Sequence, residues 1–197
     1  MSTEVRPSPI GGSQTTQALS QRLASIAASH PATLDLQGKI KVEVTRSVLS
    51  VREEYIQDNL TSTTLAGLHA ISPPPFVYKD DTAGGLLAFY HLGHKLSGHS
   101  GLVHGGIAAV LLDECMGRAS FPRLTGKISV TANLNLNYKS PIEVDSIILI
   151  RADVMEVQGR KAWVRGVIEN AEDGTVFVDA TGLFIEPKWA DSLAKLL

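Results

Sequence analysis

The chain has 197 residues, of which 44% are hydrophobic and 19% charged, so it is long enough for one domain with a substantial core. A net charge of −2 gives no general attraction to nucleic-acid phosphates or anionic lipid surfaces. The single cysteine, Cys115, excludes an internal disulfide, and no stretch approaches the ~20 apolar residues that span a bilayer. We therefore expect a soluble intracellular protein with no nucleic-acid partner and no membrane span, with the cytoplasm favoured over the mitochondrion and the mitochondrion left open as the alternative.

The N-terminal part, residues 1–30, is predicted to be a flexible extension. Residues 1–16 are rich in Ser, Thr, Gln, Gly and Pro and lack a periodic apolar pattern, so little favours their ordering. A mitochondrial presequence is rich in arginine, whereas residues 1–30 contain only two arginines beside one acidic residue, so the targeting signal is weak. Apolar residues at helical spacing predict a short helix over residues 17–29: Leu19, Leu23 and Ile26.

Residues 31–82 are predicted to be a segment of helical and extended pieces that packs on the core. Residues 40–51 fit either a strand or a helix, and the three prolines at residues 73–75 form a stiff extended connector. The core domain is expected to cover residues 83–187, and a tail over residues 188–197 follows it.

A strand is predicted over residues 86–91, and it leads into a loop that contains three histidines. The spacing of His91, His94 and His99 matches no zinc pattern, and the loop holds no cysteine or carboxylate that could complete a site. We therefore expect no bound metal ion, and nothing in the sequence calls for a cofactor.

The next segment, residues 101–119, passes from a glycine-rich turn into an almost wholly apolar run and predicts a buried helix. A helix that is apolar all round must be covered on all sides, and Asp113 interrupts this one. A carboxylate is rarely buried unless it is paired or employed, so Asp113 is either a hydrogen-bonded structural acid or a functional one. At helical spacing it stands in a stripe of small side chains that leaves room beside it: Gly106, Ala109, Asp113 and Gly117.

The sequence His104-Gly105-Gly106 falls where this helix begins. The first turn of a helix presents unpaired N–H groups that can hold an anion or stabilise an oxyanion, although a lone histidine is more often structural. Gly105 and Asp113 are eight positions apart, which is about 12 Å along a helix. A general base must act within about 3 Å of its proton, so one carbonyl cannot use both groups of one chain. If the site is catalytic, the Gly105 amide works with Asp113 of another copy, and the protein is at least a dimer.

Beyond the helix the pattern changes to the period of a β-strand. Apolar and polar residues alternate over residues 128–138, which predicts a long strand with one buried face. Three further apolar runs, over residues 146–157, 161–171 and 175–186, are separated by short turn signals and predict antiparallel hairpins. We expect an α+β fold in which an antiparallel sheet of five or six strands wraps around one long buried helix. The polar face of the first strand carries Ser129, Thr131, Asn133, Asn135 and Asn137.

These motifs resemble a known family. His104-Gly-Gly, an acid nine positions after that histidine and the strand end Asn137-Tyr-Lys-Ser-Pro141 together resemble the hotdog-fold acyl-CoA thioesterases of the PaaI-like branch. Three stretches, at residues 131–139, 159–161 and 180–185, are similar to the human mitochondrial long-chain acyl-CoA thioesterase subgroup, thioesterase superfamily members four and five. The resemblance covers about residues 83–187 and implies the hotdog fold.

The resemblance implies roles for individual residues. Gly105 matches the glycine whose amide polarises the thioester carbonyl, Asp113 matches the general base or nucleophile, and Thr131 matches a residue that positions water. Some family members use an asparagine where this chain has Gly98, and His99 is the candidate replacement. Basic side chains at strand ends and turns are expected to reach the coenzyme A phosphates. The expected substrate-binding residues are His99, His104, Gly106, Asn133, Lys139, Arg160 and Lys161.

The function that the resemblance implies is hydrolysis of acyl-CoA, or carrier-bound acyl, thioesters to free acid and thiol in fatty acid metabolism. Its active sites would lie between the subunits of a homodimer or homotetramer. A non-catalytic acyl-CoA-binding hotdog module is one alternative, and Asp113 with Thr131 argues against it. A hotdog dehydratase or hydratase is another, and the position of the acid after the His-Gly-Gly motif favours hydrolysis.

Overall fold

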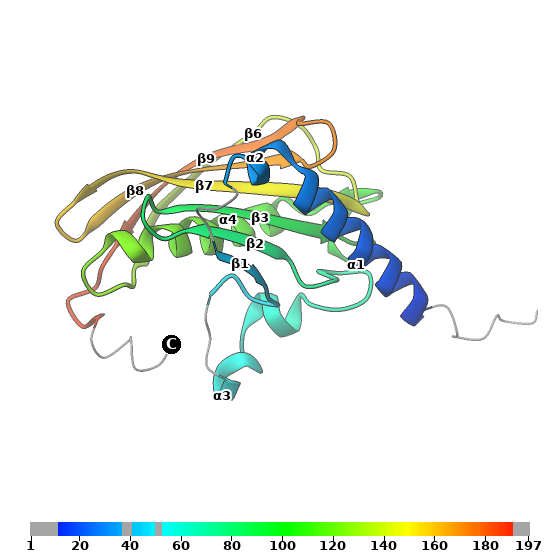
Figure 1. Ribbon diagram of the computed structural model, residues 1–197, viewed down its shortest axis with the longest axis horizontal. Coiled ribbons are helices and arrows are strands. Elements are labelled where there is room, and N and C mark those ends of the chain that lie inside the picture. Colours follow the sequence, from blue (N-terminus) through cyan, green and yellow to red (C-terminus); the bar gives the residue numbers. More distant parts are fainter. Residues whose placement is uncertain (1–11, 37–40, 50–52, 191–197) are drawn as a thin grey trace, which may run out of the picture.

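The computed structural model describes residues 12–36, 41–49 and 53–190, and an antiparallel sheet lies at its centre (Figure 1). Six strands follow the spatial order β2-β3-β7-β8-β9-β6, and the short β1 pairs with β2 at the edge. The sheet thus has seven strands where five or six were expected, because residues 41–44 of the ambiguous segment 40–51 form the additional strand β1. The strands are β1 (Lys41–Val44), β2 (Phe76–Asp80), β3 (Gly85–Leu92), β6 (Val130–Tyr138), β7 (Ser146–Gln158), β8 (Lys161–Asn170) and β9 (Val176–Ile185).

The antiparallel hairpins predicted from the turn signals are confirmed. β7 pairs with β8 and β8 with β9, each through a short turn, and β9 then pairs with β6. Strand β3, which precedes the central helix in the chain, joins the other side of β7. The strand β6 is therefore an edge of the sheet, and within the described part of the chain no strand lies beside its outer backbone groups.

Helix α4 (Gly105–Ser120) lies against one face of the sheet, as the hotdog fold requires. Its buried side chains Leu111, Leu112 and Met116 belong to one core cluster with the inward side chains of β3, β7, β8 and β9. Gly166 on β8 allows this close approach, because a Cβ at that position would lie 2.5 Å from the sulfur of Met116.

The expectation that α4 is covered on all sides is wrong for a single chain. Ala109, Val110 and Asp113 are only partly buried, whereas Leu111, Leu112 and Cys115 are buried. The sheet covers one side of the helix, and the side that carries Gly106, Ala109 and Asp113 is left partly open, whereas Gly117 of the same stripe is buried.

Two N-terminal helices cover the opposite face of the sheet (Figure 1). They are α1 (Gly12–Ser29) and α2 (Pro31–Leu34). Leu23 and Ala27 of α1 are fully buried in a second core cluster with side chains of β2, β3 and β7, such as Phe89. An ion pair between Arg22 and Glu172, 2.8 Å long, ties α1 to the turn before β9. Because helices cover both faces at β3, that strand is buried along nearly its whole length.

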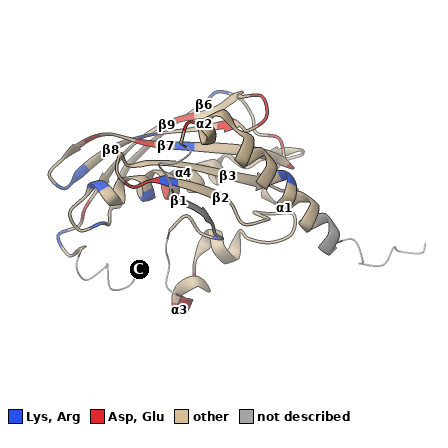
Figure 2. Cartoon of the chain, in the orientation of Figure 1, with Lys and Arg blue, Asp and Glu red and all other residues tan. Residues whose placement is uncertain are grey.

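The remaining short elements surround this core. They are α3 (Glu53–Ile56), the π-helix η2 (Leu60–Thr64), the 3₁₀ helices η3 (His94–Leu96) and η4 (Phe121–Arg123), and the small hairpin of β4 (Ser97–His99) with β5 (Leu102–Val103). Lys and Arg are interspersed with Asp and Glu over the chain (Figure 2). Within the described residues, no helix is long and apolar enough to cross a membrane. The division into segments 1–30, 31–82, 83–187 and 188–197 stays a prediction, and its residues 1–11 and 191–197 lie outside the described residues.

Candidate active site

The N-terminus of α4 is built by the His104-Gly105-Gly106 sequence. His104 is the N-cap residue, and its Nδ1 accepts a hydrogen bond of 2.9 Å from the N–H of Gly106. The N–H of Ile107 bonds the carbonyl of His104 at 2.9 Å. Among the described residues, the N–H of Gly105 makes no hydrogen bond within the chain. Of the N–H groups of Gly105, Gly106 and Ile107, that of Gly105 is therefore the one available to an oxygen of a ligand. The imidazole of His104 is already used in capping the helix.

The position where some family members carry asparagine is tightly enclosed. A Cβ at Gly98 would lie 2.8 Å from Cδ2 of His104 and 2.9 Å from its Cα. A larger residue there would push His104 out of its capping position, so the position of His104 requires a glycine at residue 98. His99 follows on β4 and is exposed.

Asp113 and Thr131 meet at the other end of the site. The hydroxyl of Thr131 donates a hydrogen bond of 2.6 Å to Oδ1 of Asp113. A β-bulge at Ala132 allows this contact. Thr131 pairs with Phe184 and Asn133 with the next residue, Leu183, so Ala132 has no partner on β9 and Thr131 is turned toward α4. Asp113 is partly buried, and the contact gives the carboxylate a fixed orientation.

The prediction that Thr131 and Asn133 share one face of the strand is wrong. The bulge turns Thr131 toward α4 and leaves Asn133 on the opposite face, where its Oδ1 accepts a hydrogen bond from Asn135. The alternation of apolar and polar residues in the sequence continues through the bulge, so it carried no signal of the change.

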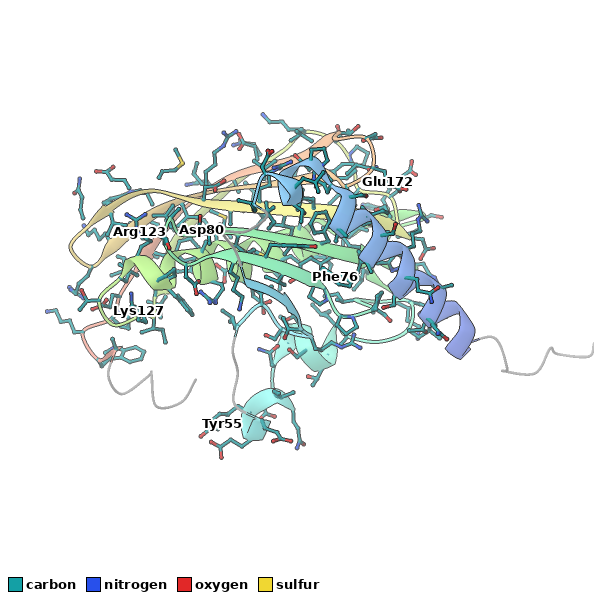
Figure 3. All side chains as sticks on the ribbon, viewed as in Figure 1. Tyr55, Phe76, Asp80, Arg123, Lys127 and Glu172 are labelled. Atoms are coloured by element: carbon teal, nitrogen blue, oxygen red, sulfur yellow. The ribbon has the colours of Figure 1, made fainter. Side chains whose placement is uncertain are left out.

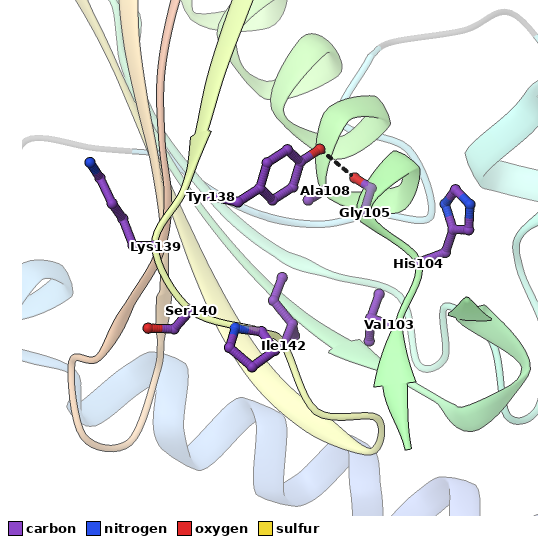
Figure 4. A pocket seen from close by; sticks show the side chains of 9 residues that line it. Val103, His104, Gly105, Ala108, Tyr138, Lys139, Ser140 and Ile142 are labelled. Atoms are coloured by element: carbon purple, nitrogen blue, oxygen red, sulfur yellow. Dashed lines mark hydrogen bonds between the residues drawn. The ribbon is translucent and has the colours of Figure 1, made fainter. Parts of the chain in front are cut away.

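A cavity of about 300 Å³ opens beside Gly105 (Figure 4). Tyr138, which our sequence reasoning did not select, lies over Gly105 and donates a hydrogen bond of 2.9 Å from its hydroxyl to the Gly105 carbonyl oxygen. The signal that could have found it was its place in the strand-end motif. The lining residues are Val103, His104, Gly105, Ala108, Tyr138, Lys139, Ser140, Pro141 and Ile142.

The three basic residues expected to serve one site lie at opposite ends of the sheet. Lys139 follows Tyr138 and lines the cavity beside Gly105. Lys161 pairs with Ile185, which pairs with Val130 at the start of β6. That strand rises about 3.3 Å per residue, so nine residues separate the two lysines by roughly 30 Å. Arg160 lies in the turn beside Lys161, where it bonds the backbone carbonyl of Glu186 at 2.8 Å.

The histidines of the loop do not come together as a set of three. His91 is buried, with Nδ1 3.0 Å from the carbonyl oxygen of Ser72, and Nε2 of His91 lies 3.9 Å from Asp145. His94 lies 4.0 Å from the same carboxylate, whereas His99 is elsewhere on β4. In the part of the chain that the structure describes, no three His, Cys, Asp or Glu side chains are arranged to hold a metal ion.

Glu114 is a titratable residue that our sequence reasoning missed. It follows Asp113 on α4 but faces η2, where the hydroxyl of Thr61 lies 2.9 and 3.0 Å from its two carboxylate oxygens. Burial raises the pKa of Glu114 to about 7, against the opposing effect of the Thr61 hydrogen bond, and the charge of Asp113 adds to the rise. A carboxyl group that titrates near neutrality therefore lies beside the candidate base.

Comparison with known proteins places this geometry in a family. The thioesterase superfamily matches residues 100–177, which hold the whole of α4 and the strands β6, β7 and β8. That part of the chain is thus similar to the thioesterase superfamily, and the chain has the hotdog fold. The resemblance found in the sequence is thereby confirmed. A solved structure of a thioesterase superfamily protein shares the fold, with a TM-score of 0.54 over 90% of this chain and 81% of that one, at 24% identity.

Two relatives extend the comparison. An uncharacterized mitochondrial protein of Candida albicans is 32% identical over 142 residues, which are 70% of this chain and 64% of that protein. The acyl-coenzyme A thioesterase THEM4 of Bos taurus is 31% identical over 110 residues, which are 56% of this chain and 44% of that one. The chain thus spans less than two thirds of the length of these curated relatives. The family and the bovine relative support the class of enzyme expected from the sequence, a thioester hydrolase.

Proposed function

We propose that this protein hydrolyses acyl-CoA thioesters to a free acid and coenzyme A, with Asp113 as the base that activates water. The observation that supports this most is the pairing of Asp113 with Thr131, since a bulge in β6 turns the hydroxyl toward the carboxylate. The unbonded N–H of Gly105 at the start of α4 is the donor for the oxyanion. The bovine relative, whose name is that of an acyl-CoA thioesterase, supports the substrate class.

The proposed reaction needs few groups. Water attacks the thioester carbonyl carbon while Asp113 takes its proton, and the resulting oxyanion accepts a hydrogen bond from the N–H of Gly105. The tetrahedral intermediate then collapses, the carbon–sulfur bond breaks, and the thiolate takes up the proton held by Asp113. Thr131 orients the carboxylate through its hydrogen bond of 2.6 Å.

Two copies of the chain are required in this proposal. Gly105 and Asp113 lie on one helix, about 12 Å apart along its axis, so a carbonyl held by one cannot meet the other. In each copy the Gly105 end carries Tyr138 and Lys139, and the Asp113 end carries Thr131. We propose a homodimer, which can pair into a tetramer, whose sites each join the Gly105 end of one copy to the Asp113 end of the other.

The remaining assignments follow from the same arrangement. We propose that Lys139 of one copy, with Arg160 and Lys161 of the other, contacts the phosphates of coenzyme A, and that His99 lines the substrate path. The expected substrate-binding role of Asn133 is not proposed further, because that side chain lies on the face of β6 away from α4. The cytoplasmic location expected from the weak targeting signal is not supported by the comparisons, because the Candida relative is described as mitochondrial. We propose a mitochondrial location.

Replacement of Asp113 by asparagine tests the proposed function. Asp113→Asn keeps the size of the side chain and the hydrogen bond from Thr131 but removes the base, so the rate of thiol release from acyl-CoA should fall by a factor on the order of 10²–10⁴. Asp58→Asn is the matched control, because Asp58 is exposed on the segment before η2. Wild-type turnover by Asp113→Asn contradicts the proposal. Binding of acyl-CoA without thiol release by the native protein indicates a binding module, and a change in the acyl chain without thiol release indicates a hydratase or dehydratase.

A further inference from the structure

Tyr138 makes an unusual contact for an exposed side chain. The residue is 57% exposed at the end of β6, yet its hydroxyl donates a hydrogen bond to the Gly105 carbonyl oxygen rather than turning to solvent. Its ring also lies against the Cα of Gly105, because a Cβ built there would be 3.4–3.5 Å from ring atoms and the hydroxyl oxygen. Strand β6 is thus tied to the first residue of α4 (Figure 4).

The first turn of α4 needs such a tie. Gly105 and Gly106 are consecutive glycines, and glycine has more backbone freedom than any other residue. The N–H of Gly106 is fixed from one side by Nδ1 of His104. The N–H of Gly105 makes no hydrogen bond among the described residues, and it shares a peptide plane with the His104 carbonyl, which accepts a hydrogen bond from the N–H of Ile107. The Gly105 carbonyl belongs to the next peptide plane, so a contact to that carbonyl restrains the φ and ψ of the glycine that joins the two planes. Among the side chains described here, Tyr138 is the one that bonds the Gly105 carbonyl.

We infer that Tyr138 is a positioning residue, which holds Gly105 so that its N–H points into the cavity where the thioester carbonyl binds. This inference rests on the proposed thioesterase function and adds to it a residue that acts through Gly105. Oxyanion donors contribute only when they are fixed before the charge develops, and small misalignments reduce the rate markedly. The ring alone cannot fix the carbonyl, so the hydroxyl is the group that matters.

The test is Tyr138→Phe, which keeps the ring and removes the hydroxyl. The kcat for acyl-CoA hydrolysis should fall by about 10-fold, which corresponds to the loss of one hydrogen bond, while KM changes little. The melting temperature should stay at the wild-type value, because the side chain is more than half exposed. Hydrogen–deuterium exchange at the amides of residues 104–106 should become faster. Tyr55→Phe is the control, since Tyr55 lies on α3, which projects away from the sheet (Figure 3).

The outcomes separate this inference from the proposed function. If wild-type protein hydrolyses acyl-CoA and Tyr138→Phe keeps the wild-type kcat, the inference is overturned while the function stands. A fall in melting temperature with unchanged kcat per folded molecule also overturns it, because that is the effect of a purely structural tyrosine. If the wild-type protein releases no thiol, the proposed function fails, and unchanged exchange in Tyr138→Phe would then overturn the tie between β6 and α4 as well.

Discussion

If Asp113 is the base, as we propose, Thr131 decides which of its two oxygens can take the proton. A threonine hydroxyl has one proton to donate, and here it is directed to Oδ1 of Asp113 at 2.6 Å. Oδ2 of the carboxylate is left to accept a proton from water. The bulge at Ala132 is the backbone feature that allows this, and bulges commonly re-aim side chains beside active sites.

The hydrogen bonds around Glu114 depend on whether its carboxyl group is protonated. The Thr61 hydroxyl oxygen lies 2.9 and 3.0 Å from the two carboxylate oxygens of Glu114 and 3.2 Å from Oδ1 of Asn59. One hydroxyl proton cannot serve three acceptors. If Glu114 is protonated, one of its oxygens can donate to Thr61 while Thr61 donates to Asn59, so two of the three contacts are hydrogen bonds instead of one. The raised pKa of Glu114, about 7, agrees with this arrangement.

The pH dependence of stability tests this account of Glu114. The pKa of about 7 in the folded protein exceeds the ordinary 4.5, so the stabilising contribution is fully present below pH 4.5 and is lost as pH rises to 7. The free energy of unfolding of the wild type should therefore fall, relative to Glu114→Gln, by about 1–3 kcal/mol over that window. Urea unfolding of both proteins at several pH values measures the difference. Parallel curves for the two proteins would contradict the shifted pKa.

The residues that could be predicted from sequence are those whose role depends on local structure. His104 and Gly105 were identifiable because a helix N-terminus presents unpaired N–H groups, and Asp113 because a carboxylate in an apolar run is unusual. Tyr138 and Glu114 were missed because their contacts are made by segments distant in the chain. Tyr138 reaches Gly105 only after β6 has taken its place at the edge of the sheet.

At the scale of elements, α1 has a clear structural role. Leu23 and Ala27 are buried on the face of the sheet opposite α4, in a cluster that includes Phe89 and Leu149. Without this helix, the apolar side chains of that cluster would face water. The helix that the sequence indicated in residues 17–29 thus lies within a longer one that is part of the core packing.

The mutation Leu23→Ala tests the contribution of α1. Removal of a fully buried leucine side chain should lower the free energy of unfolding by about 2–5 kcal/mol. Turnover per folded molecule should stay unchanged, because α1 lies on the face of the sheet away from α4. Gln21→Ala on the exposed side of the same helix is the control and should change stability little. A loss of turnover by folded Leu23→Ala would show that α1 influences the site.

The elements that were predicted correctly carry strong periodic signals. The hairpins of β7, β8 and β9 have long apolar runs separated by short turns, and α4 follows a glycine-rich turn. Strand β1 and the π-helix η2 could not be predicted, because both are short and their positions depend on the sheet edge and on Glu114. The secondary structure of these two elements therefore depends on the surfaces that they pack on and not on a local sequence pattern.

At the scale of the whole molecule, our proposal assigns to each chain two incomplete halves of a site. Among the described residues, the Gly105 end has the proposed oxyanion donor, a cavity and Lys139 but not the proposed base, and the Asp113 end has that base without the donor. The partly exposed side of α4 around Ala109 and Asp113 is suited to packing against a second copy. Small residues on that side would let the two helices approach closely, and a twofold axis would bring each Gly105 end to an Asp113 end.

Subunit exchange between two inactive variants tests this two-chain site most directly. Asp113→Asn removes the base, and Gly105→Pro removes the donor at a helix position where proline is favoured. A mixed dimer holds one site with both defects and one intact site. Thiol release from acyl-CoA should therefore reappear on mixing, to about half of the wild-type rate per mixed dimer. Circular dichroism of each variant checks that it is folded, and native mass spectrometry checks that mixed dimers have formed. Mixed dimers that remain as inactive as the parents would contradict the account.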